Sequence, residues 1–286
     1  MYNHDDLKKL AGEYKKIKAP DTLHTEARQI LYGKKKSNNI TVLFKTAGLT
    51  AATLAVTFIA AANLSPSFAE TLQGIPFLNS AARFVTFRAY EQTDEHHDMA
   101  IDQPQIDGLE DAGLTRTLNS KYAEKAAELY DEYTKKTEGG IENITLLSGY
   151  TIKSDNGTTV SIEHSLFTAE ASGAQRYEYD TLDTQNELYL TLPGLFKDDT
   201  YIERISNSVR QQMNDQMAEH PDRQFFLGEN GFSTIDAKQQ FYINDSHQLV
   251  IVFDEYAVAP GSMGTQEFII PSSEIADLLV SSFYIK

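Results

Sequence analysis

Pairs of carboxylates are the residues of this 286-residue sequence whose type and spacing come nearest to a catalytic arrangement. Asp180 and Asp183 form one pair, and Asp198 and Asp199 form another. Two carboxylates that face one substrate could cleave a glycosidic bond by acid and base catalysis. The chain has 41 Asp and Glu residues, however, so such pairs arise by chance, and Asp198-Asp199 is typical of a helix N-terminus. We therefore predict no glycosidase site.

The histidines offer no better general base and no metal site. His164 lies in an alternating stretch and His247 beside a turn, which favours surface or hydrogen-bonded positions. His96, His97 and Asp98 lie together in a polar segment without the spacing of a ligand set. The chain has no cysteine, and no hydrolase elbow, zinc-protease motif, phosphate-binding loop or dinucleotide fingerprint occurs. We predict a protein without catalytic residues, metal or cofactor.

A loop after a dense apolar run is the most distinctive short feature. The run LVIVF at 249–253 predicts a buried strand, and the residues APGSMG at 259–264 follow it. Loops carry binding residues more often than strands do, because they are exposed at the surface. We therefore treat this segment as a candidate binding loop. A wide connection between two strands is the alternative.

The elements that must position this loop are helices and strands of the second half of the chain. Apolar periodicity predicts helices at 118–137, 201–219 and 273–281. β-Branched and aromatic runs between turn formers predict strands at 144–152, 158–169, 175–179, 188–192, 241–243, 248–256 and 267–270. This order predicts an α+β fold in which helices pack on one face of an antiparallel sheet. Upstream, 70–89 could be a juxtamembrane helix or an edge strand, and acidic 91–111 predicts a linker.

An uncharged stretch at 46–69 dominates the first third of the chain. It contains no Asp, Glu, Lys, Arg or His, and about 20 apolar residues cross a bilayer as a helix. We interpret it as a transmembrane helix rather than as a buried helix of a soluble protein. Ser67-Phe68-Ala69 also has the small-x-small pattern of a signal peptidase site, so the anchor could be cleavable.

The charge distribution orients this predicted span. Residues 1–45 hold ten Lys or Arg and five Asp or Glu, whereas residues 46–286 have a net charge of −21. The excess of basic residues places the N-terminus in the cytoplasm and the C-terminal part outside, in the cell membrane as a single-pass protein. The acidic exterior argues against nucleic acid and suits a cationic partner.

The first residues predict amphipathic helices that need a partner. Leu7, Leu10, Tyr14 and Ile17 form one apolar stripe, and a second helix is predicted through about residue 32. Two short helices cannot bury such stripes alone. They would pack on a partner protein, with the membrane surface as the alternative.

These patterns divide the chain into four predicted parts. They are a cytoplasmic part at 1–45, a transmembrane helix at 46–69, a juxtamembrane segment with an acidic linker at 70–116, and an extracytoplasmic α+β domain at 117–286. The last part has a strand-rich portion at 141–192 and a C-terminal portion at 193–286.

The segment VIVFDEYAVAPGSMGTQEFIIP at 250–271 resembles the C-terminal extracytoplasmic domain of the bacterial anti-sigma-V factors, a domain also found in some peptidoglycan deacetylases. The order of helices, span and acidic exterior is similar as well. The resemblance implies a transmembrane anti-sigma factor of the lysozyme-sensing type. Its cytoplasmic helices would bind an extracytoplasmic-function sigma factor. Its exterior would bind lysozyme or a similar cationic protein. Signal peptidase and then an intramembrane protease would release the sigma factor.

The same resemblance implies roles for particular residues. Sigma binding would fall on Leu7, Leu10, Tyr14 and Ile17, and signal peptidase cleavage on Ser67, Ala69 and Glu70. Ligand binding would fall on Tyr256, Pro260, Gly261, Ser262, Met263 and Gly264. The alternatives are a membrane-anchored binding module of the cell wall without a sigma partner, and an enzyme that acts on wall glycan.

Overall fold

Two β-sheets and the helices that cover them make up the part of the chain that the computed structural model describes, residues 75–79, 81–228 and 231–286. These residues belong to one unit, Gly48–Lys286. The predicted sigma-binding residues, transmembrane helix and cleavage site lie outside the described residues. Within the described ranges, no helix is long and apolar enough to cross a membrane.

Seven strands form the first sheet, in the order β1-β2-β3-β4-β5-β6-β7. They are β1 (Ile75–Pro76), β2 (Arg83–Thr93), β3 (His97–Asp107), β4 (Ile144–Asp155), β5 (Thr159–Ala169), β6 (Gly173–Asp183) and β7 (Leu188–Leu190). Neighbours are antiparallel except β3 and β4, which run parallel. The predicted α+β class is confirmed for the described residues, but the expectation of one purely antiparallel sheet is wrong.

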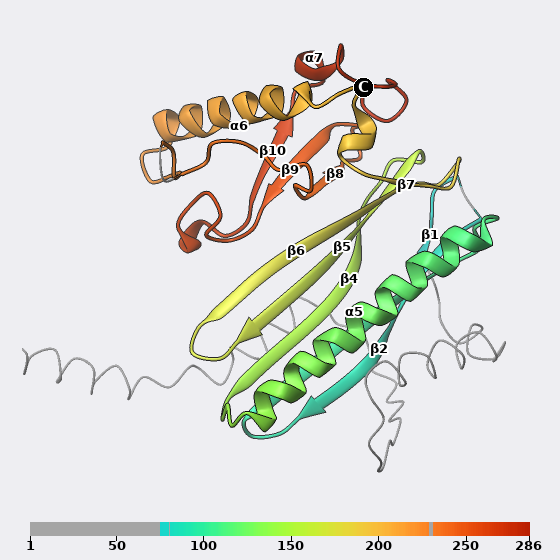
Figure 1. Ribbon diagram of the computed structural model, residues 1–286, viewed down its shortest axis with the longest axis vertical. Coiled ribbons are helices and arrows are strands. Elements are labelled where there is room, and N and C mark those ends of the chain that lie inside the picture. Colours follow the sequence, from blue (N-terminus) through green and yellow to red (C-terminus); the bar gives the residue numbers. More distant parts are fainter. Residues whose placement is uncertain (1–74, 80, 229–230) are drawn as a thin grey trace, which may run out of the picture. The chain divides into compact units, whose positions relative to one another are not determined.

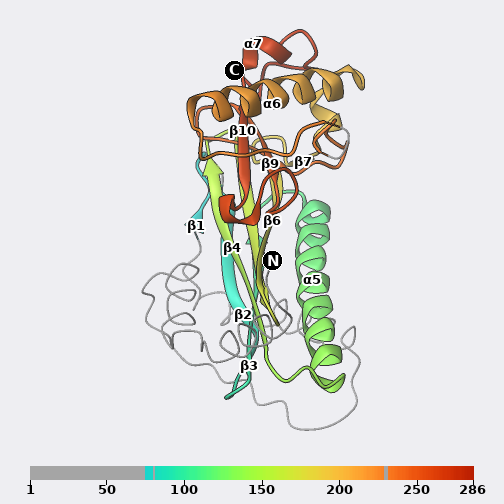
Figure 2. The same ribbon diagram turned by 90° about the vertical axis from the view of Figure 1, so that its left-hand side faces the viewer.

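The parallel pair follows from α5 (Ala112–Glu138), the helix that connects β3 to β4. Parallel neighbours need a crossover connection that returns the chain to the same end of the sheet. The carboxylate of Asp111 caps this helix by accepting hydrogen bonds from the backbone N–H groups of Gly113 and Leu114. Helix α5 lies along one face of the sheet (Figures 1 and 2). Its buried apolar side chains belong to the same core clusters as those of the strands.

The acidic composition of residues 91–111 predicts a linker, but strands β2 and β3 occupy most of this segment. The linker prediction is therefore wrong. Met99, Ile101 and Ile106 of β3 are all buried against the neighbouring elements. A few apolar side chains at these positions are enough to hold the strand in the core. The polar and acidic residues between them hide this pattern when the segment is judged by composition.

The second half of β3 has a helix side chain in place of a neighbouring strand. β3 pairs with β4 only as far as Ile101. Beyond that point the N–H of Ile106 donates to Asn119 Oδ1 at 2.8 Å, and Asn119 Nδ2 donates to the Ile106 carbonyl at 2.9 Å. Pro104, which has no N–H, is tolerated here because one edge of the strand has no ladder to complete.

The remaining residues, 193–286, form a smaller layered unit that we call the C-terminal module. Its antiparallel sheet has the order β10-β9-β8, and α6 lies on one face of it (Figure 1). Ile205, Val209 and Met213 of α6 are buried in the same core cluster as the strands. The elements are η1 (Pro193–Leu195), α6 (Thr200–Glu219), β8 (Phe241–Ile243), β9 (Leu249–Phe253), η2 (Gly261–Met263), β10 (Gln266–Ile270) and α7 (Ser272–Ile275).

Side chains, rather than shared strands, join the C-terminal module to the seven-stranded sheet. The rings of Tyr179 and Tyr242 stack with their centroids 5.3 Å apart. Lys153 Nζ lies 3.2 Å from a carboxylate oxygen of Glu163 on the large sheet and 2.9 Å from one of Glu267 on the small sheet. One lysine thus neutralises part of the charge of two facing carboxylates.

Strand β6 also donates hydrogen bonds directly to side chains of the C-terminal module. The N–H of Tyr177 donates to Asp254 Oδ1 at 3.3 Å, and the N–H of Tyr179 donates to Gln240 Oε1 at 2.9 Å. These acceptors take the place of a further strand along this part of β6. This part of β6 is therefore covered by the start of the loop that follows β9 and by the residue that precedes β8.

Candidate ligand-binding site

The candidate binding loop connects β9 to β10 and comprises residues 254–265; we call it the β9–β10 loop. It follows β9, whose five residues are all buried, so the loop begins from a fixed base. The six residues predicted to bind ligand all lie in it, at Tyr256, Pro260, Gly261, Ser262, Met263 and Gly264. The structure brings these residues together, while their binding role stays a prediction.

Tyr256 has the most unusual conformation in the β9–β10 loop. Its φ angle is +67°, a left-handed value that is rare for a bulky residue and costs of order 1–3 kcal/mol. Tyr256 is 64% exposed as a residue, so core packing does not explain this conformation. The ring lies against Gly261, where any side chain would overlap it. The loop therefore presents one aromatic ring to solvent over a glycine.

Gln266 holds the end of the β9–β10 loop in a fixed shape. This buried side chain donates from Nε2 to the carbonyl oxygens of Met263 (2.6 Å), Gly264 (3.1 Å) and Thr265 (3.2 Å). Gly264 has a φ of +64°, which glycine adopts without steric cost. A loop that is already ordered loses less conformational entropy when it binds a partner.

A neighbouring segment contributes a second exposed aromatic residue, Phe226, which no sequence motif marks. The N–H of Phe226 donates to the carbonyl of Val258 in the β9–β10 loop at 2.8 Å. The Phe226 side chain is 39% exposed, whereas the preceding Phe225 is buried. The sequence feature that could have indicated an exposed ring is the pair of adjacent phenylalanines on an irregular segment, because only one of the two can point into the core.

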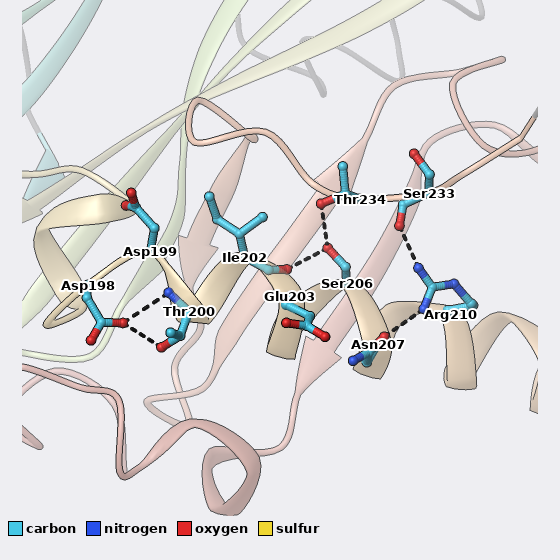
Figure 3. A pocket seen from close by; sticks show the side chains of 10 residues that line it. All are labelled: Asp198, Asp199, Thr200, Ile202, Glu203, Ser206, Asn207, Arg210, Ser233 and Thr234. Atoms are coloured by element: carbon cyan, nitrogen blue, oxygen red, sulfur yellow. Dashed lines mark hydrogen bonds between the residues drawn. The ribbon is translucent and has the colours of Figure 1, made fainter.

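The hollow drawn in Figure 3 lies elsewhere in the C-terminal module, along the first turns of α6, and has a volume of about 540 Å³. Asp198 accepts from the N–H of Thr200 at 3.0 Å, as expected of a helix N-terminus. Arg210 donates to the carbonyl of Ser233, and the hydroxyl groups of Ser206 and Thr234 are 3.2 Å apart. Because these groups already bond one another, the hollow is a less suitable site than the β9–β10 loop.

A serine, a histidine and a glutamate lie in the order of a hydrolase triad on the large sheet, but they are structural. Ser148 Oγ is 3.0 Å from His164 Nε2, and Glu178 Oε2 is 3.9 Å from His164 Nδ1. Contact with the His164 ring, with a smaller contribution from Lys125, lowers the pKa of Glu178 to about 2. Ser148 and His164 are buried and His164 stacks on Tyr150, so no substrate could reach the hydroxyl.

The other acidic pair and the His96-His97 segment also make structural contacts. Asp180 accepts from Lys121 Nζ, and Asp183 accepts from the side chain of Asn186 at 2.7 Å. His97 Nδ1 is 3.1 Å from Asp94. Among the described residues no group of three or more His, Asp or Glu side chains could hold a metal ion.

Comparison with known proteins gives a match over nearly the whole chain. The chain is 34% identical over 284 residues to the anti-sigma-V factor RsiV of Bacillus subtilis (strain 168), and the match covers 98% of this chain and 99% of that protein. The name of this relative describes a regulator rather than an enzyme, in agreement with the sequence prediction. A family model described as "Protein of unknown function (DUF3298)" matches residues 194–273, within the C-terminal module.

Two solved structures are similar in fold. A DUF3298-family protein from Bacteroides fragilis NCTC 9343 matches with a TM-score of 0.54 and 15% identity, over 71% of this chain and 96% of that chain. A DUF3298-family protein from Pseudomonas aeruginosa PAO1 gives a TM-score of 0.48 and 11% identity, over 70% of this chain and 94% of that chain. The first of these supports the fold and carries no information on a ligand.

Proposed function

Because the chain belongs to the family of the anti-sigma-V factor RsiV, we propose that it holds an extracytoplasmic-function sigma factor inactive and frees it when its C-terminal part binds a cationic ligand. The observation that carries this proposal is the identity over 98% of this chain and 99% of RsiV. A match of that extent includes the N-terminal segment as well as the described residues. The proposed function therefore concerns the whole chain and does not rest on one shared domain.

Sigma binding is proposed for the apolar stripe of the first helix, Leu7, Leu10, Tyr14 and Ile17. The test is transcription from a sigma-dependent promoter in cells that contain the full chain and each extracytoplasmic-function sigma factor of the host. Leu10→Asp should release transcription, because a charge would interrupt the apolar contact. The matched control is Lys9→Asp, which replaces a positive charge by a negative one beside the stripe. Equal transcription with and without the wild-type chain, for every sigma factor, would remove the proposal.

Membrane anchoring at 46–69 and cleavage at Ser67, Ala69 and Glu70 are the second part of the proposal. The test is the size of the N-terminal fragment on a blot of membranes from cells that contain the tagged full chain, with and without added lysozyme. Ala69→Phe should block the lysozyme-dependent fragment, because signal peptidase sites need small residues at this position. Phe68→Leu alters only the intervening residue and serves as the control. A fragment of wild-type size from Ala69→Phe would contradict the assignment.

The proposed ligand is a cationic protein, and lysozyme is the probe. A net charge of −21 on residues 46–286 would attract a basic protein and speed its association. The association rate should therefore fall as salt concentration rises, whereas contacts made by the β9–β10 loop should govern the dissociation rate. Surface plasmon resonance with the detergent-solubilised full chain at several salt concentrations measures both rates.

A further inference from the structure

The turn between β4 and β5 is bonded to two parts of the chain that are far apart in sequence. Asp155 lies at its start. One carboxylate oxygen, Oδ2, accepts from the N–H of Leu78 at 2.7 Å, and the other, Oδ1, accepts from the N–H of Gly157 at 3.1 Å. The backbone N–H of the same residue donates to Asp245 Oδ1 in the C-terminal module at 3.0 Å. Asp155 therefore touches both the first described residues and the last module.

The contact with the first described residues is tight. Asn79 Nδ2 lies 3.5 Å from the carbonyl of Gly157, and Gln185 Nε2 donates to the same carbonyl at 2.9 Å. Gly157 has a φ of +77°, and a side chain there would overlap the Asn79 amide. Leu78 itself is 56% exposed, so hydrogen bonds rather than apolar burial hold this residue in place.

The contact with the C-terminal module reaches the end of β8 and the turn that leads into β9. Ser154 Oγ donates to the carbonyl of Ile243 at 2.6 Å, and Asn156 Nδ2 donates to the carbonyl of Asn244 at 3.1 Å. Both acceptors lie at the end of β8, next to the turn that precedes β9. A shift of this turn is carried along the five buried residues of β9 to the β9–β10 loop, because a packed strand moves as a unit.

Residues 75–79 are the described residues nearest to the predicted cleavage site. Ile75 is six residues beyond Ala69, so the two are separated by at most about 20 Å of chain. β1 has only two residues, paired with Phe84 and Arg83 of β2, and the buried ring of Phe77 adds an apolar contact that any opening of this segment must also break. Because proteases cut segments that have opened locally, the bonds at Leu78 and Asn79 would limit how far this segment can open.

We propose that the β4–β5 turn is a latch, with Asp155 as its positioning residue, which keeps residues 75–79 on the sheet until a ligand occupies the β9–β10 loop. This inference rests on the proposed function, because it assigns the step that couples ligand binding to cleavage. The ligand opens the latch by binding more tightly to the chain in which the turn after β8 has moved away from Asp155 and Asn156. Residues 75–79 then leave β2, and the segment before them becomes a protease substrate.

The first test compares cleavage of the tagged full chain in membranes without ligand. Asp155→Ala removes the acceptor for Leu78, and basal cleavage is expected to rise about fivefold, the factor that one lost hydrogen bond gives. Asp155→Asn keeps one acceptor oxygen and should fall between wild type and Asp155→Ala. The matched control is Asp198→Ala, which removes two hydrogen bonds to Thr200 at the start of α6 and leaves the latch intact. Basal cleavage equal in Asp155→Ala and Asp198→Ala overturns the latch.

The second test locks the latch with a disulfide. The chain has no cysteine, and the Cβ of a side chain at residue 157 would lie 4.0 Å from Leu78 Cβ, within the range for a disulfide. The variant is Leu78→Cys, Asn79→Gly and Gly157→Cys. The glycine makes room for the bridge and tolerates the φ of +56° at residue 79, while the cysteine at residue 157 is strained by its φ of +77°. When oxidised, it should bind lysozyme and resist cleavage, and a reductant should restore cleavage. Cleavage of the oxidised form at the wild-type rate overturns the proposal.

The two tests separate failure of the latch from failure of the proposed function. If lysozyme triggers cleavage of the wild type but Asp155→Ala leaves basal cleavage unchanged, the latch is overturned and the proposed function stands. If lysozyme has no effect on the wild type but Asp155→Ala is cleaved more than Asp198→Ala, the latch stands and the assigned ligand is wrong.

Discussion

Tyr256 combines a strained backbone with an exposed ring. One mutation should therefore change stability and ligand affinity in opposite directions. Tyr256→Asn is expected to raise the free energy of unfolding by about 1 kcal/mol, because asparagine adopts a positive φ at lower cost. The same change removes the aromatic surface and should lower the affinity for lysozyme at least about tenfold, as is common for a central aromatic contact. Denaturant unfolding and surface plasmon resonance measure the two effects.

Phe283→Ala is the matched control for this prediction, because it removes another exposed ring in the C-terminal module, outside the β9–β10 loop. Its affinity for lysozyme should equal that of the wild type. If Phe283→Ala and Tyr256→Asn bind equally well, the ring of Tyr256 has no part in ligand binding.

Glu178 should make the stability of the chain depend on acid pH. Its pKa is lowered from 4.5 to about 2 by the His164 ring and Lys125, so the folded state favours the charged carboxylate. This contribution is fully present above about pH 4.5 and is lost as the pH falls toward 2. Glu178→Gln should therefore flatten the decline of the melting temperature between these values, whereas Glu128→Gln on the exposed side of α5 should not. A wild-type pH profile from Glu178→Gln would contradict the assignment.

At the scale of elements, Asn119 performs for β3 what a neighbouring strand would otherwise do. Asn119→Ala leaves the N–H and the carbonyl of Ile106 without their partners, and Ile106 is fully buried. The expected loss is about 2 kcal/mol of unfolding free energy, the cost of unpaired buried polar groups. Chemical denaturation measures it, with Glu128→Ala on the same helix as the control. Equal stability of the two variants would mean that water bonds the Ile106 N–H and carbonyl as well as the Asn119 side-chain amide does.

The elements show which features could be predicted from sequence. Helix α6 and strand β8 begin and end within one residue of their predictions, because apolar spacing and turn formers mark both clearly. The predicted start of α5 is six residues late, at 118 instead of 112, because its cap at Asp111 lies in a run of acidic residues. The composition of β3 does not predict a strand for a similar reason: Met99, Ile101 and Ile106 are few among polar neighbours.

The candidate site was predictable only in part. The loop at 259–264 follows a strand that its composition predicts, so its location could be inferred. The positive φ of Tyr256 could not, because sequence rules reserve that conformation for glycine and asparagine. The contacts of Asp155 are also beyond sequence reasoning, since they join residues 77 and 90 positions apart.

At the scale of the whole molecule, Lys153 should contribute to the stability of the contact between the two sheets. Lys153→Met leaves Glu163 and Glu267 facing each other without a cation and should lower stability by about 2 kcal/mol, between the values for exposed and buried ion pairs. Adding Glu267→Gln to Lys153→Met should recover part of this loss, because the repulsion is removed. A double-mutant cycle by denaturant unfolding measures the coupling, and Lys238→Met at an exposed position is the control. Additive effects of the two changes would show that the pair is not coupled.

The seam between the sheets also has a mechanical consequence. Because Asp254, Gln240 and the two stacked tyrosines make side-chain contacts, no shared ladder of backbone bonds has to be torn for the layers to part. If one end of the chain is anchored and a large ligand is bound at the other, a pulling force would act on this seam first. Its contacts would yield one at a time while each layer stays folded. A protein whose layers are joined in this way could stretch and recover, and its last 90 or so residues could be transplanted onto other chains during evolution.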